Sequence, residues 1–243
     1  MEIAACCDVG KVRRVNEDGC YISAFADDCG FLIVADGMGG HRGGSTASQM
    51  AVEEIRRSLA GQTFLKKSAE QIEGWMKRAV EQANQAVYER ALSEDSLSGM
   101  GTTVVLSIVV KQTLYTLNVG DSRLYYIRSG NIIQVTKDHS VVQELIDLGE
   151  ITPEEATVHP SKNIITRAVG TDCNVEYDFY VQNMQPNDVA LLCTDGLSNM
   201  LSDAEILALN KDGISMEAYV KSLVHEANAR GGYDNITALA VRF

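Results

Sequence analysis

Residues 31–37 read FLIVADG, and residues 189–196 read VALLCTDG. Each segment is a continuous apolar run that ends in an aspartate and a glycine, which predicts a strand buried on both faces with a carboxylate at its end. An Asp-Gly pair commonly marks a hairpin turn. Here no returning strand follows either pair, because Asp36 leads into a glycine-rich segment and a helix, and Asp195 leads into a capped helix. A carboxylate at the end of a core strand is costly to desolvate unless it is paired with a cation or hydrogen-bonded, so the two aspartates predict a shared metal site.

Three further aspartates extend this prediction. Asp18 follows Asn-Glu just before a predicted strand, Asp121 lies in Gly-Asp-Ser, and Asp234 lies in Gly-Gly-Tyr-Asp-Asn. Each of them alone is typical of a turn, and Asp121 between two hairpin strands is the most easily explained in that way. Hard divalent ions prefer oxygen ligands, so aspartates without nearby His or Cys clusters favour Mg²⁺ or Mn²⁺ over Zn²⁺.

The rest of the chain alternates between strand-like and helical patterns. Short β-branched runs bounded by Gly, Asn or Asp predict antiparallel strands. These runs cover residues 19–25, 30–35, 102–110, 113–119, 123–128, 131–135, 175–181, 189–194 and 236–243. Apolar residues at three- and four-residue spacing predict helices over residues 46–59, 68–93 and 216–229. Long amphipathic helices among antiparallel strands indicate an α+β fold in which helices cover the outer faces of packed sheets.

We expect residues 1–243 to form one domain. A chain of 243 residues with 45% hydrophobic content can bury one substantial core, and it contains no repeat, low-complexity tract or proline-rich linker. Residues 138–163 read differently, as short helical pieces of which the second opens at Pro153. This segment is either a long connection or a flap beside a functional site, and the pattern leaves both readings open.

Charge and composition disfavour several classes of partner. The chain has 21 Lys and Arg against 33 Asp and Glu, a formal net charge of -12, which disfavours nucleic acid and anionic lipid as partners. An anionic substrate would then need a local positive charge, which bound divalent ions or a well-placed arginine supply. The start of the sequence shows no secretory leader, and no apolar run is long enough to span a membrane, so we expect a cytoplasmic protein without membrane insertion. In that compartment the six cysteines are expected to be reduced.

A series of ordered motifs resembles one known family. The motifs are RxxNED at 13–18, VADGMGGH at 34–41, GMGTT at 99–103, NVGDSR at 118–123, DHS at 138–140, HPxxNxIxRAVG at 159–170, CTDGL at 193–197 and GGYDNIT at 231–237. In this order and spacing they resemble the bacterial branch of the PPM, or type 2C, protein serine/threonine phosphatases. The resemblance runs from about residue 8 to the carboxyl terminus.

This resemblance implies a four-layer α-β-β-α sandwich with metal ions in a cleft at one end. By the match, Mn²⁺ or Mg²⁺ would be held directly by Asp36, Asp195 and Asp234 and by the backbone carbonyl of Gly37. Asp18 would act directly or through water, and Asp121 would help to hold a third, weaker ion beside the first two. Glu17 and Asn235 would support these ligands from behind.

The implied reaction is hydrolysis of phosphoserine and phosphothreonine by direct attack of a hydroxide that bridges two ions. Arg13 would grip two phosphate oxygens, and strand alternation would turn Arg14 to the opposite side. His41 is the candidate donor of a proton to the departing alkoxide, although a histidine after a glycine-rich loop can also lie behind the ligands. The resemblance further implies that the protein acts on phosphorylated proteins, opposes a cognate serine/threonine kinase in bacterial signalling, and is expected to be a monomer.

Three alternatives stay open on the sequence. Residues 7–13 fit CxxGxxR, the phosphate loop of cysteine-dependent phosphatases, with Cys7 as nucleophile, although Arg14 and Asn-Glu-Asp follow in place of Ser or Thr. A catalytically dead pseudophosphatase would bind phosphoproteins only, yet all five aspartates are present. A hydrolase of small phosphorylated metabolites would use the same site chemistry.

Overall fold

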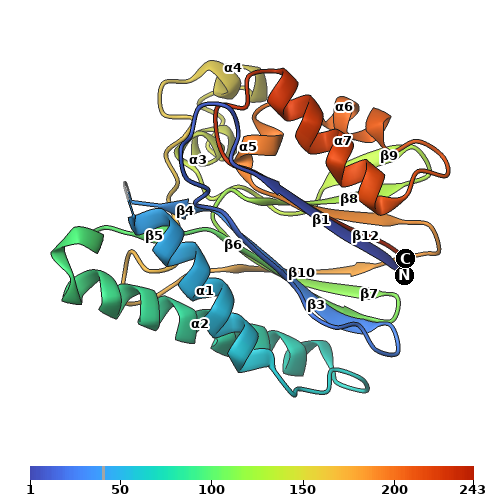
Figure 1. The fold of residues 1–243 in the computed structure, drawn as a ribbon, viewed down its shortest axis with the longest axis horizontal. Helices are drawn as coiled ribbons and strands as arrows, with labels where there is room; N and C mark the ends of the chain where they lie inside the picture. Colours follow the sequence, from blue (N-terminus) through green and yellow to red (C-terminus); the bar gives the residue numbers. More distant parts are fainter. Residues whose placement is uncertain (40–41) are drawn as a thin grey trace.

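The computed structural model describes residues 1–39 and 42–243, and in these residues two five-stranded antiparallel sheets pack face to face between layers of helices (Figure 1). The first sheet has the strand order β1, β12, β11, β8, β9. Its strands are β1 (Glu2–Asp8), β12 (Ile236–Arg242), β11 (Val189–Cys193), β8 (Arg123–Arg128) and β9 (Asn131–Gln134). The second sheet has the order β10, β7, β6, β3, β2. Its strands are β10 (Asp178–Asn183), β7 (Thr113–Val119), β6 (Val104–Val110), β3 (Cys29–Ala35) and β2 (Gly19–Ile22).

The helices form the two outer layers. Helices α1 (Gly43–Leu59) and α2 (Ala69–Ser93) cover the second sheet, and α7 (Met216–Ala229) packs on β1 and β12 of the first (Figure 1). The shorter elements complete the chain. They are α3 (Val141–Asp147), α4 (Pro153–Val158), α5 (Asp195–Ser198), α6 (Asp203–Leu209), the 3-10 turn η1 (Asp95–Leu97) and the two-residue pair β4 (Gly37–Met38) and β5 (Gly101–Thr102). This arrangement confirms the predicted α+β sandwich.

The layering explains why the decisive strands are apolar throughout. In β3, Phe31, Ile33 and Ala35 pack toward α1 and α2. The alternate residues Leu32 and Val34 lie between the two sheets. Because successive strand residues point to opposite faces, a strand covered on both faces needs apolar residues at every position.

Two sequence-based strand assignments need correction. Strand β1 was not predicted, because its residues other than Ile3 are small or charged, yet β1 pairs with β12 over its whole length. The strand expected at 175–181 instead spans Asp178–Asn183, where it pairs with β7. In both cases the partner strand decides the position, since pairing and burial outweigh local propensity.

The segment 138–163 contains two short helices, as expected. Thr152 caps α4 through a capping box and Pro153 opens that helix. Among residues 1–39 and 42–243, none of the helices combines the length and apolar character needed to cross a lipid bilayer.

Candidate metal centre

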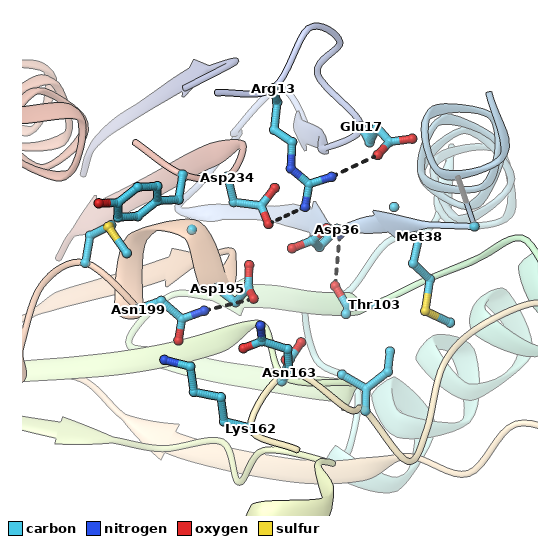
Figure 2. A pocket seen from close by; sticks show the side chains of 17 residues that line it. Arg13, Glu17, Asp36, Met38, Thr103, Lys162, Asn163, Asp195, Asn199 and Asp234 are labelled. Atoms are coloured by element: carbon cyan, nitrogen blue, oxygen red, sulfur yellow. Dashed lines mark hydrogen bonds and ion pairs between the residues drawn. The ribbon is translucent and has the colours of Figure 1, made fainter. Parts of the chain in front are cut away.

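Four of the five predicted aspartates line a cavity of about 550 Å³ at one end of the sandwich. Asp36, Asp121, Asp195 and Asp234 all line it, and each comes from a different part of the chain. Arg13 and Gly37 also line it, and Glu17, which was expected behind the ligands, lines it too. Figure 2 shows Arg13 and Lys162 on opposite sides of the Asp195 carboxylate. The wall of the cavity therefore carries both carboxylates and cationic side chains.

Asp36 is held by its backbone at the end of β3. Its N–H donates to Thr103 Oγ1 at 2.9 Å, and its carbonyl oxygen accepts from Thr102 Oγ1 and from the Thr103 N–H, both at 2.8 Å. The next residue, Gly37, must be glycine, because a Cβ atom there would lie 2.1 Å from the Gly44 carbonyl oxygen. These contacts fix the direction in which the Asp36 carboxylate leaves the strand.

Asp195 begins the short helix α5 directly after β11. Its Oδ2 accepts a hydrogen bond from Asn199 Nδ2 at 3.0 Å, one turn further along. A Cβ atom on Gly196 would lie 1.9 Å from the Asn235 carbonyl oxygen, so only glycine allows α5 to approach the end of the Asp234 loop this closely. The packing brings Asp195 and Asp234 into one cavity, although they lie on different segments.

Asp18 lies behind the cavity and is not among the described residues that line it. Its Oδ2 accepts from Thr237 Oγ1 at 2.7 Å and from Thr194 Oγ1 at 2.9 Å. Its Oδ1 is buried and has no hydrogen-bond partner in the described part of the chain. A buried carboxylate oxygen left without a partner is unfavourable, so this atom is suited to an ion or to a water that an ion holds.

Arg13 lies on a loop that the far end of the chain holds in place. Arg13 Nη2 donates to Asp234 Oδ2 at 2.7 Å, and Nη1 lies 3.8 Å from Glu17 Oε2, beyond hydrogen-bond distance. Asn235 anchors the loop at three points, because its Nδ2 donates to the carbonyls of Val9 and Val15 at 2.9 and 3.0 Å and its Oδ1 accepts from the Glu17 N–H at 2.8 Å. Asn235 thus supports the site by anchoring this loop.

The separation of the two neighbouring arginines has a different origin from the expected one. Residues 9–18 contain no strand, so alternation along a strand does not apply to them. Arg13 nevertheless lines the cavity, and Arg14 is exposed and is not among the described lining residues. The bends of the loop, held by Asn235, separate the two side chains.

The predicted proton donor His41 and the alternative nucleophile Cys7 have different outcomes. His41 lies outside the described residues. Cys7 lies on strand β1 and is not among the described residues of the cavity lining. Residues 9–18, which follow it, include no helix, whereas the phosphate loop of a cysteine-dependent phosphatase opens one.

Burial and mutual repulsion dominate the electrostatics of the carboxylates. Burial raises the pKa of Asp18 to about 7, and burial together with the charge of Asp195 raises the pKa of Asp121 to about 7. Burial and the charges of its aspartate neighbours raise the pKa of Asp36 well above its ordinary value. Like charges in a site of low polarity disfavour ionisation, and a bound cation reverses that effect.

This donor set fits a hard divalent ion, because it consists of oxygen atoms. One of them, the buried Asp18 Oδ1, has no hydrogen-bond partner among the described residues. Within residues 1–39 and 42–243, however, no three acidic, histidine or cysteine side chains converge so that they could hold an ion as they stand. The carboxylates line the cavity walls, where Arg13 and Asn199 contact two of them.

Sequence reasoning missed several residues of the site. Thr103, Lys162, Asn163 and Asn199 line the cavity. Thr103 lies in the motif at 99–103, and Lys162 and Asn163 lie in the motif at 159–170. Their positions within these motifs could have marked them as candidate site residues. Asn199 has no such signal, because only its position one helical turn after Asp195 brings it to the site.

The chain is similar to known proteins over nearly its whole length. The family model described as Protein phosphatase 2C matches residues 11–238. The serine/threonine phosphatase stp of Listeria welshimeri serovar 6b is 42% identical over 234 residues, which cover 96% of this chain and 92% of that protein. The S. agalactiae serine/threonine phosphatase has the same fold, with a TM-score of 0.93 and 37% identity over 100% of this chain and 99% of that one. The catalytic domain of the serine threonine protein phosphatase PstP, solved in complex with two manganese ions, gives a TM-score of 0.84 and 35% identity over 98% of this chain and 96% of that one.

Proposed function

This chain belongs to the protein phosphatase 2C family and is a metal-dependent protein serine/threonine phosphatase, and we propose that the aspartates around its cavity hold the ions that drive the reaction. The observation that carries this proposal is the meeting of Asp36, Asp121, Asp195 and Asp234 in one cavity with Arg13 at its edge. A pseudophosphatase would have lost such ligands. The family relatives are named as phosphatases of proteins, which favours phosphorylated proteins over small metabolites as substrates.

We infer that the site binds Mn²⁺, because the PstP relative was solved with two manganese ions. We further infer that Mg²⁺ can replace it, because both ions prefer oxygen ligands. Asp36, Asp195 and Asp234 would bind directly, together with the carbonyl of Gly37. Asp18 would contribute the buried Oδ1 that lacks a described partner. Asp121, which also lines the neighbouring cavity under the segment 138–163, would hold a third ion.

Divalent ions in this site supply positive charge for the phosphate and activate an attacking water. The protein's own contribution is to bind and orient the phosphate. Arg13 would turn its planar guanidinium from Asp234 toward two phosphate oxygens, a geometry that lysine does not reproduce. Lys162, on the opposite side, would add a second positive charge at the entrance. His41 is proposed as proton donor to the leaving alkoxide on the sequence match alone.

We further propose the biological setting that the sequence suggested. The protein would reverse the action of a cognate serine/threonine kinase on that kinase and its substrates. It would work as a monomer of one catalytic domain in the cytoplasm.

Glu17, which reaches the cavity wall itself, would orient Arg13 rather than bind an ion.

A phosphate-release assay tests the proposed function. We expect release from phosphoserine and phosphothreonine peptides in Mn²⁺, no release in EDTA, and recovery when Mn²⁺ is restored. The Cys7→Ser variant should retain this activity, and a phosphotyrosine peptide should be a poor substrate. Full activity in EDTA together with its loss in Cys7→Ser would replace the metal mechanism by a thiolate one.

A further inference from the structure

Two cysteines connect the edges of the two sheets. Cys7 lies on β1, the edge strand of the first sheet, and Cys20 lies on β2, the edge strand of the second. Their sulfur atoms are 3.1 Å apart. Within the described residues, this is the one hydrogen-bond contact that joins two cysteine side chains. The contact thus bridges the two sheets at one edge of the sandwich.

The neighbouring thiols are kept away from this pair. Cys6 precedes Cys7 in the chain but packs with the apolar cluster under α7, on the other face of β1. Cys29 packs with the cluster beneath α1 and α2, whereas Cys20 packs between the sheets. Cys7 is exposed and Cys20 is half-buried, so a small reagent from solvent can reach Cys7 first.

The segment between the two cysteines carries part of the metal centre. Cys7 and Cys20 are 13 residues apart, and Arg13, Glu17 and Asp18 lie between them. Thr237, which faces Cys7 on the paired strand β12, donates a hydrogen bond to Asp18. The loop already runs from β1 to β2, so a covalent link between the two sulfurs would close it into a ring at its base.

We propose that Cys7 and Cys20 are a modification site at which a peroxide forms a disulfide that closes the Arg13 loop. The Cys7 sulfur attacks a peroxide oxygen, the O–O bond breaks, and one water leaves as Cys7 becomes a sulfenic acid. The Cys20 sulfur then attacks the Cys7 sulfur, the S–O bond breaks, and a second water leaves. Two thiols are oxidised by two electrons and one hydrogen peroxide is reduced to two waters.

The geometry requires little movement. The two sulfurs have to approach by about 1 Å to reach disulfide distance. A disulfide that closes a loop of this length removes conformational freedom from the unfolded chain. We therefore expect oxidation to raise the melting temperature by roughly 5–10 °C.

Peptide mapping after treatment with hydrogen peroxide tests the site without an activity assay. Trypsin leaves Cys6 and Cys7 together on residues 1–11, and Cys20 and Cys29 together on residues 15–42. The expected product is a disulfide between these two peptides, with loss of two thiols and recovery by dithiothreitol. Because each peptide holds two cysteines, Cys6→Ser and Cys29→Ser serve as matched controls and should still form the link.

Cys7→Ser and Cys20→Ser should each abolish both the linked peptides and the rise in melting temperature. The proposal is overturned if Cys7 is oxidised to a sulfinic acid without a link, if the link survives Cys7→Ser, or if it joins two chains. It is also overturned if peroxide leaves both thiols free in the folded, unmodified protein.

Discussion

His139 holds Gly120 from both sides. Its imidazole Nδ1 accepts a hydrogen bond from the Gly120 N–H at 3.0 Å, and its own backbone N–H donates to the Gly120 carbonyl oxygen at 3.0 Å. The backbone carbonyl of His139 also accepts from the Thr166 N–H at 2.8 Å, beyond the segment 138–163. Since Gly120 directly precedes Asp121, this histidine connects the base of the segment to a proposed metal ligand.

We expect His139→Ala to destabilise the fold, because the buried Gly120 N–H loses its acceptor. The expected loss in free energy of unfolding is about 1–3 kcal/mol. His139→Asn should recover most of it, because asparagine Oδ1 can accept at the position of Nδ1. Urea denaturation of the three proteins measures the difference. Equal losses in the alanine and asparagine variants would show that the hydrogen bond to Gly120 contributes nothing.

The metal-free protein should lose stability as the pH rises from about 4 to about 7. The pKa values of Asp18 and Asp121 are raised to about 7 in the fold, so both residues bind protons more tightly in the folded state than in the unfolded one. Their contribution is fully present below their unfolded pKa of about 3.9 and is lost as the pH passes through the folded values. The lowered pKa of His139 has the opposite sign, since its contribution grows as the pH rises toward about 6.5.

Urea denaturation in EDTA across this pH range measures the effect. Asp121→Asn removes one of the titrating groups and should flatten the dependence, and saturating Mn²⁺ should suppress it in the unmodified protein. A parent and an Asp121→Asn variant with the same pH dependence would contradict this account of the carboxylates.

Asp36→Asn and Asp195→Asn should reduce the stabilisation by Mn²⁺. An ion at 100-fold excess over its dissociation constant stabilises the folded state by about 2.7 kcal/mol, which raises the melting temperature of a chain of this size by roughly 5–10 °C. Each substitution removes a proposed ligand and should lower both this rise and the turnover. Asp212→Asn, at an exposed position outside the described cavity lining, is the matched control and should keep the full rise. Calorimetry that detects no effect of Mn²⁺ on the unmodified protein would count against a shared site.

Arg13→Ala should reduce kcat/KM by about 10- to 100-fold, because a charged contact with two donors is worth about 1.5–3 kcal/mol. Arg13→Lys should restore little of this loss, since an ammonium group cannot present two parallel donors. Arg14→Ala should stay within a few-fold of the parent, because Arg14 is exposed and is not among the described lining residues.

Steady-state kinetics on a phosphothreonine peptide, run beside a manganese titration, measure both effects. Arg13→Ala should still bind Mn²⁺ normally, because Arg13 is not a ligand. A larger defect in Arg14→Ala than in Arg13→Ala would mean that another arginine binds the phosphate.

The sequence by itself determined the two-layered sheet architecture and singled out the aspartates that we propose as metal ligands. Strands β3 and β11 are apolar at every position because helices cover one face and the other sheet covers the second, and that requirement is written into local composition. Asp36 and Asp195 stood out because a carboxylate at the end of such a strand needs compensation.

Only the tertiary structure shows which residues position the segments that carry those carboxylates. Strand β1 forms because β12 offers it a partner, although its own residues carry a weak strand pattern. Asn235 anchors the Arg13 loop, and His139 holds Gly120. In both cases the partners are far apart in the sequence, so no local sequence pattern predicts the contact. Cys7 meets Cys20 only because the edges of the two sheets stack. Side-chain periodicity follows from the geometry of one element, whereas contacts between elements depend on how all the layers pack, so only the folded chain specifies them.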